Sequence, residues 1–155
     1  MNTQERPIGW TTVDEAKRLM AANIDPKSAD MSYIKDRDYW RMLPDPSTAV
    51  KDHLFSFRKG YELPCWSLGA LLDLLPKEIL PKNGSKSYLI ATEGIEHPWT
   101  LVYSDCDNND IPGFAFQKDT LVEACIEMII ALKVAEQEGK AFVPWPQDDM
   151  KGGEK

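Results

Sequence analysis

The stretch Pro64-Cys65-Trp66-Ser67-Leu68-Gly69-Ala70-Leu71-Leu72-Asp73-Leu74-Leu75-Pro76 decides the fold, because it carries the start and stop signals of one short apolar helix. Ser67 is a favoured N-cap residue, and Trp66 and Leu71 have the spacing of a hydrophobic staple around it. Pro76 ends the helix at the preceding residue. The face expected to be buried consists of Leu68, Leu71, Leu72 and Leu75. Asp73 is the one charged residue of the helix, so we expect protein to cover most of the helix circumference.

Length and composition are those of an ordinary globular chain. The 155 residues are enough for one domain that buries about two thirds of its unfolded surface without a disulfide or a metal. No apolar run reaches the ~20 residues of a membrane span, so we expect no membrane association. The start lacks a signal-peptide pattern, and the three cysteines lack close-pair spacing. We therefore expect reduced thiols and a cytoplasmic location.

The net charge of −7 is unevenly placed along the chain. Residues 1–60 carry ten Lys/Arg and nine Asp/Glu, whereas residues 61–155 carry eight and sixteen. Nucleic-acid affinity rests on clustered Lys and Arg, and no such cluster is present. The charge pattern therefore argues against a nucleic-acid partner.

Two further helices have clear signals. Thr12 and Glu15 have capping-box spacing at the start of a helix over residues 12–22. Thr120 and Glu123 have the same spacing at the start of the last helix, which keeps a regular apolar face. Gly139 marks its end.

Strand formers lie between the central and last helices. The predicted strands are residues 87–92, 99–103 and 114–116. The first two are close enough to form an antiparallel hairpin. Residues 25–63 are the least regular part, with short turns and a candidate helical piece near 47–53.

These elements predict an α+β fold, in which a small antiparallel sheet, a hairpin or three strands, packs against about three helices. We expect one globular domain over residues 1–146. Residues 147–155 are polar and contain glycine, which predicts a disordered tail.

No motif identifies an activity, and we assign no catalytic, cofactor-binding or metal-binding residue. Residues 105–110 begin like a calcium loop, but Asp110 stands where the loop needs Gly and Phe116 where it needs Glu, so a solvated turn explains them better. The cysteines, with His53 and His97, lack the spacing of a zinc site. No glycine-rich phosphate loop is present.

An alternative is a small enzyme with a Cys or Ser nucleophile at the 65–67 helix start. Cys65 is a thiol near a helix N-terminus, where its pKa can fall, and Ser67 lies at a strand-to-helix turn. The sequence does not show whether His53 or His97 approaches either residue. Packing explains Cys65, and capping explains Ser67.

Aromatic residues are dense before the central helix. Seven of the fifteen aromatic residues fall within residues 33–66, interleaved with arginines. The interpretation that we favour is that these rings pin an irregular segment onto the core. The alternative is a partner surface, because aromatic residues and Arg are enriched at protein interfaces. Its candidate residues are Tyr39, Trp40, Arg41, Phe55 and Phe57.

Two motifs together carry a resemblance to known proteins. Residues 64–76 read P-x-W-S-L-x-x-L-L-x-x-L-P, and residues 119–132 read D-x-x-x-E-A-x-x-x-M-I-x-x-L. The pair resembles small proteins of no known activity that are encoded in prophages and mobile elements of gut anaerobic bacteria. The resemblance implies a phage or mobile-element accessory protein in the cytoplasm of a bacterial host, and it transfers no functional residue.

The sequence therefore predicts a non-catalytic accessory protein that acts through contacts with an unidentified protein partner, without a cofactor. The small enzyme described above is the first alternative, and a nucleic-acid-associated regulator is the second.

Overall fold

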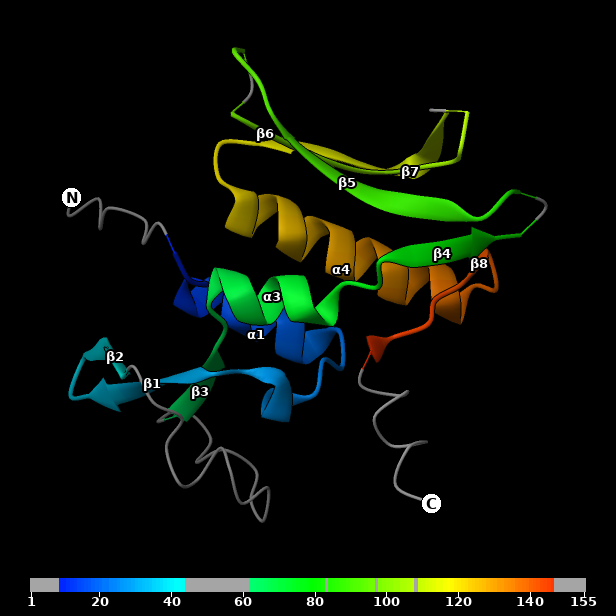
Figure 1. Ribbon diagram of the computed structural model, residues 1–155. Helices are drawn as coiled ribbons and strands as arrows, with labels where there is room; N and C mark the ends of the chain where they lie inside the picture. Colours follow the sequence, from blue (N-terminus) through cyan, green and yellow to red (C-terminus); the bar gives the residue numbers. More distant parts are fainter. Residues whose placement is uncertain (1–8, 44–61, 83, 97, 108, 147–155) are drawn as a thin grey trace. The chain divides into compact units, whose positions relative to one another are not determined.

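The computed structural model describes residues 9–43, 62–82, 84–96, 98–107 and 109–146 (Figure 1). The chain divides into two compact units, Met1–Ala70 and Leu71–Lys155. The single domain over residues 1–146 stays a prediction. The candidate helical piece near 47–53 and the tail 147–155 lie outside the described residues.

The elements follow one another as labelled in Figure 1. The first unit contains α1 (Val13–Ala21), the 3-10 helix η1 (Pro26–Ser28), β1 (Met31–Asp36), β2 (Tyr39–Leu43) and β3 (Glu62–Cys65). The next helix, α3 (Leu68–Leu74), contains the boundary between the units. The second unit continues with β4 (Glu78–Pro81), β5 (Ser87–Glu93), β6 (Trp99–Ser104), β7 (Asp110–Lys118), α4 (Leu121–Gln137) and β8 (Ala141–Phe142).

The fold class is α+β, as predicted, with three α-helices among the described residues. The strand content is larger than the predicted hairpin or three strands. One antiparallel sheet has three strands in the order β2-β1-β3, and the other has five in the order β7-β6-β5-β4-β8.

In the first unit, the sequence before α1 sets where the helix begins. The Thr12 side chain accepts a hydrogen bond from the Glu15 N–H, and the Glu15 carboxylate accepts one from the Thr12 N–H. Both halves of the predicted capping box are therefore present. Ala16 and Leu19 have no exposed surface. The helix packs against β3.

The segment 25–63, predicted as irregular turns, contains β1, β2 and the start of β3. The β1–β2 hairpin closes at the Asp36–Tyr39 pair, so its connection is Arg37-Asp38. Short hairpin connections usually contain Gly or Asn, and this one contains neither, which is why the sequence did not indicate it. Arg37 adopts φ 59°, a left-handed conformation that costs a residue with a Cβ about 1–2 kcal/mol.

The substitution Arg37→Gly is therefore expected to raise the free energy of unfolding by about 0.5–1 kcal/mol, because glycine adopts positive φ without that cost but loses more backbone entropy. Urea unfolding at 25 °C measures the change. Asp38→Gly is the matched control, because Asp38 is not among the residues with positive φ, and it should not stabilise the protein. Equal stabilisation by both substitutions would contradict this account of the turn.

The central helix α3 is present where the sequence predicted it, and Ser67 Oγ accepts from the Ala70 N–H at 3.1 Å as an N-cap. The predicted buried face is partly wrong. Leu72 is 38% exposed, whereas Leu71, Leu74 and Leu75 are buried. These three residues follow the same i, i+3, i+4 spacing, but the buried stripe that they form is rotated around the helix from the predicted one. Protein covers this stripe and leaves most of the helix circumference uncovered, contrary to the prediction.

In the second unit, the predicted strands β5, β6 and β7 form an antiparallel meander. Glu93 pairs with Trp99 across the predicted hairpin, and β7 begins at Asp110, which is the last residue of the predicted turn at 105–110. The helix α4 lies along one face of this meander and packs against β6 and β7 (Figure 1). Its buried face consists of Val122, Ala124, Cys125, Ile126, Met128, Ile129, Leu132 and Ala135.

The two ends of α4 follow the sequence signals. Thr120 Oγ1 accepts from the Glu123 N–H at 3.1 Å, and the helix ends just before Gly139, which adopts φ 69°. The sequence missed β4 and β8. Pro81 weakens the strand signal of β4, and β8 has only two residues.

Candidate functional site

Three of the five residues predicted for an interaction surface come together on β2. Tyr39 is 56% exposed, Arg41 is also exposed, and Trp40 is half-buried between them in the sequence. Phe55 and Phe57 lie outside the described residues. The surface considered below is therefore Tyr39, Trp40 and Arg41, which we call the β2 surface.

The pairing of β2 with β1 places these side chains on two faces. Tyr39 lies opposite Asp36, Trp40 opposite Lys35, and Arg41 opposite Ile34. Because side chains alternate along a strand, Tyr39 and Arg41 share one face and Trp40 lies on the other. The Lys35 ammonium lies 5.8 Å from the centre of the Trp40 ring, a cation–π contact that helps to hold the ring in place.

Other aromatic residues of the same stretch belong to the core. Tyr33 is buried and donates its hydroxyl to the Thr11 carbonyl oxygen at 2.6 Å. Trp66 has no exposed surface, and its Nε1 donates to Ser28 Oγ at 2.8 Å. Within the described residues, packing into the core therefore accounts for Tyr33 and Trp66. A partner surface at Tyr39 and Trp40 stays a prediction.

The helix start at residues 65–67 was the candidate for a nucleophile. Cys65 is fully buried, and burial raises the pKa of its thiol to about 11. Thr11 Oγ1 lies 3.7 Å from the sulfur. At neutral pH this thiol is protonated, which is the unreactive form. His53 and His97, considered as its partners, lie outside the described residues.

Ser67 is held by a loop carboxylate. Its N–H donates to Asp30 Oδ1 at 2.9 Å, and its hydroxyl donates to Asp30 Oδ2 while it accepts from the Ala70 N–H. These bonds occupy both the donor and an acceptor position of the hydroxyl. The arrangement ties η1 and its following loop to the start of α3, which is a structural role.

The segment compared with a calcium loop is a turn. Asp105 Oδ1 accepts from the backbone N–H groups of Asp107 and Asn109. The Asn109 N–H, as the largest contribution, lowers the pKa of the Asp105 carboxyl. Among the described residues, no group of three or more His, Cys, Asp or Glu is arranged to hold a metal ion.

The sequence did not indicate the outward face of the β5–β6–β7 meander. Cross-strand partners share a face, so the register places Tyr88, Ile90, Thr92, Thr100, Val102, Ala115 and Gln117 on the side away from α4. None of the seven is charged, and Tyr88 is 45% exposed. Glu78 and Asp110 lie at the margins of this face through their pairing with Tyr88 and Ser104. This uncharged face is recognised only from the pairing of β5, β6 and β7, which the sequence does not state.

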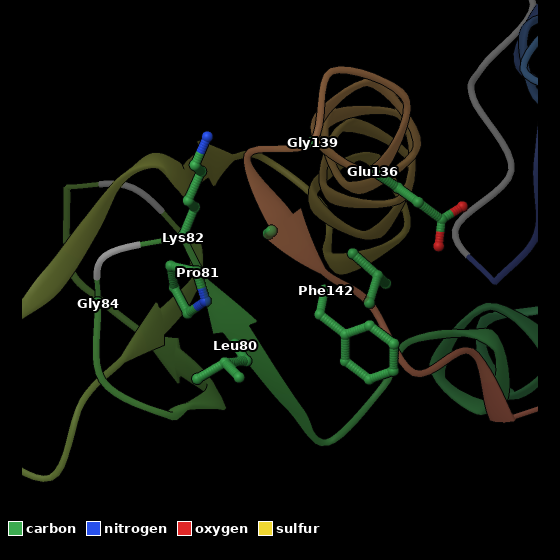
Figure 2. A pocket seen from close by; sticks show the side chains of 9 residues that line it. Leu80, Pro81, Lys82, Gly84, Glu136, Gly139 and Phe142 are labelled. Atoms are coloured by element: carbon green, nitrogen blue, oxygen red, sulfur yellow. The ribbon is translucent and has the colours of Figure 1, made fainter.

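A shallow hollow of about 600 Å³ lies where β4 meets β8 (Figure 2). Leu80 and Phe142 pair across these strands and are 48% and 67% exposed. Figure 2 shows the ammonium of Lys82 and the carboxylate of Glu136 pointing away from the space between these two side chains. Glu136 accepts from Trp145 Nε1 at 2.9 Å. The hollow therefore offers apolar walls without convergent polar groups, which suits an apolar side chain rather than a polar metabolite.

No match to this chain was found among protein-family models, curated proteins or solved structures. In the part of the chain that the structure describes, no helix is both long enough and apolar enough to cross a membrane.

Proposed function

We propose that this chain is a non-catalytic accessory protein of a prophage or mobile element, and that it acts in the bacterial cytoplasm by binding another protein through the β2 surface. The observation that carries the proposal is the exposure of Tyr39 beside Arg41 on a strand at the edge of the three-stranded sheet. The prophage origin rests on the two sequence motifs alone.

The chemistry of the β2 surface suits a protein partner. Tyrosine and arginine are enriched among the residues that dominate binding energy, because each buries a large area and keeps a polar end. The contact between Lys35 and Trp40 reduces the ring freedom that binding would otherwise cost. The small enzyme remains the alternative, but its candidate thiol at Cys65 is protonated and enclosed.

The test compares two tyrosines of similar exposure on different strands. Tyr39→Ala should lower the amount of a specific host or mobile-element protein captured from cells at least ten-fold, because it removes an aromatic anchor. Tyr88→Ala is the matched control, since Tyr88 is 45% exposed against 56% for Tyr39. For each captured protein, quantitative mass spectrometry gives the ratio of the amount captured by the variant to the amount captured by the unaltered chain.

The midpoint temperature of thermal unfolding should differ by no more than about 3 °C between either variant and the unaltered protein, because truncating an exposed side chain changes stability little. Trp40→Ala is a second variant on the same strand, and a melt that falls by 10 °C or more would place Trp40 in the core instead. Capture that is unaffected by Tyr39→Ala, or reduced equally by Tyr88→Ala, would overturn the assignment of the β2 surface.

A further inference from the structure

The strand β2 has one partner among the described strands. It pairs with β1, and the order of the sheet places it at the edge. An edge strand presents backbone N–H and C=O groups on its open side at regular spacing, and these groups bind an extended chain rather than a helix or a flat surface. A ligand that pairs with the backbone of β2 would therefore be an extended chain.

The register indicates which backbone groups are open. Asp36 and Tyr39 close a two-residue connection, and the pair at such a position is a hydrogen-bonded pair of the ladder. Pairs alternate from there, so Tyr39 and Arg41 direct their N–H groups to β1. Trp40 and Met42 direct theirs to the open side.

The side chains of β2 define the ligand's charge pattern. Arg41 is exposed on one face, and the half-buried Trp40 and Met42 lie on the other. A strand added beside β2 would place successive side chains on these two faces in turn. A carboxylate beside Arg41 and apolar side chains beside Trp40 and Met42 give the favourable cross-strand pairs.

We propose that β2 binds its partner by strand addition, and that the partner contributes an extended segment in which acidic and apolar residues alternate. This inference rests on the proposed function, because it names the kind of partner segment that the same surface takes.

Charge also separates this partner from a second copy of the chain. Antiparallel pairing of two β2 strands centred on Arg41 would put two arginines directly opposite each other, which is destabilising. A charged residue on a short edge strand is a usual guard against self-pairing. In that register Arg41 opposes a second copy, whereas it attracts an acidic strand.

The experiment uses the full chain labelled with ¹⁵N and two seven-residue synthetic peptides, one that alternates valine and glutamate and one that alternates valine and lysine. At saturation, the glutamate peptide should slow amide hydrogen exchange of Trp40 and Met42 at least ten-fold and leave Tyr39 and Arg41 unchanged. The lysine peptide should bind at least ten-fold more weakly, and Arg41→Glu should reverse that preference.

Three results would overturn strand addition. One is peptide binding without slower exchange at Trp40 and Met42. Another is equal affinity for the two peptides. The third is slower exchange at these amides as the protein concentration rises without peptide, which would identify a second copy as the occupant.

A proline variant separates this inference from the proposed function. Met42→Pro removes an open N–H, whereas Met42→Leu keeps the N–H and an apolar side chain. Met42→Pro should abolish glutamate-peptide binding and cellular capture together, and Met42→Leu should preserve both. If capture depends on Tyr39 but survives Met42→Pro, the proposed function stands and strand addition fails. If Tyr39→Ala leaves the captured amount unchanged, the proposed function fails. If Met42→Pro does not fold, the exchange measurement on the unaltered chain decides.

Discussion

Trp66→Ala is expected to lower the free energy of unfolding by about 3–5 kcal/mol, because it removes a fully buried indole and leaves a cavity that a packed interior closes only partly. It also removes the hydrogen bond from Nε1 to Ser28 Oγ, at 2.8 Å. Urea unfolding followed by far-UV circular dichroism measures the loss without relying on tryptophan fluorescence.

Trp66→Phe separates the two contributions. Phenylalanine keeps most of the buried apolar area but has no N–H, so the loss should be about 1–2 kcal/mol. Ser28 Oγ still donates to the Asp25 carbonyl oxygen at 2.6 Å, so its own donor stays satisfied. A loss under 1 kcal/mol for Trp66→Ala would show that this ring does not hold the first unit together.

Local signals explain which parts of the fold the sequence predicted. Thr12, Ser67 and Thr120 each accept from a backbone N–H in the first turn of their helix. Such a cap depends on residues three positions apart, so it can be read directly from the sequence. The strands β5 and β6 were also predicted, because strand formers are concentrated there and the connection is short.

The parts that were missed depend on residues far apart in the chain. The hairpin of β1 and β2 turns at Arg37, whose positive φ has no sequence signal of its own. The two-residue strand β8 exists through its pairing with β4. The buried face of α3 includes Leu74 and leaves Leu72 exposed, because the surrounding protein decides which stripe is covered.

The interaction surface stays a prediction, but the positions of its residues show what the sequence could indicate and what it could not. Composition alone indicated Tyr39, Trp40 and Arg41, since aromatic residues and arginine are dense there. Their position on an edge strand follows from strand order, which the sequence does not state. The division of the aromatic stretch between surface and core likewise depends on distant contacts, such as that between Tyr33 and Thr11.

Alkaline pH is expected to destabilise the protein through its buried thiols. Burial raises the pKa of Cys65 to about 11 and that of Cys125 to about 12, from a usual value of 9.0. Burial also raises the pKa of the Tyr103 hydroxyl, which donates to the Pro76 carbonyl oxygen at 2.6 Å. Each group is neutral in the folded state over a range where it ionises in the unfolded state.

The sign of the effect follows from proton binding. Below pH 9 both states hold the thiol protons, so these groups add no pH dependence. Above pH 9 the unfolded state releases them while the folded state keeps them, and the free energy of unfolding falls by up to about 1.4 kcal/mol per pH unit for each thiol. From pH 8 to pH 10 the two thiols together should remove about 2–3 kcal/mol.

Urea unfolding at several pH values between 8 and 10, with reductant present, measures this slope. Cys125→Ala should reduce the slope by about half, because one of the two buried thiols is then absent, whatever the substitution does to stability at pH 8. Cys106→Ala is the matched control at the exposed cysteine and should leave the slope unchanged. A slope that Cys125→Ala does not reduce would contradict the burial of this thiol on the inner face of α4, and with it the packing of the second unit's core.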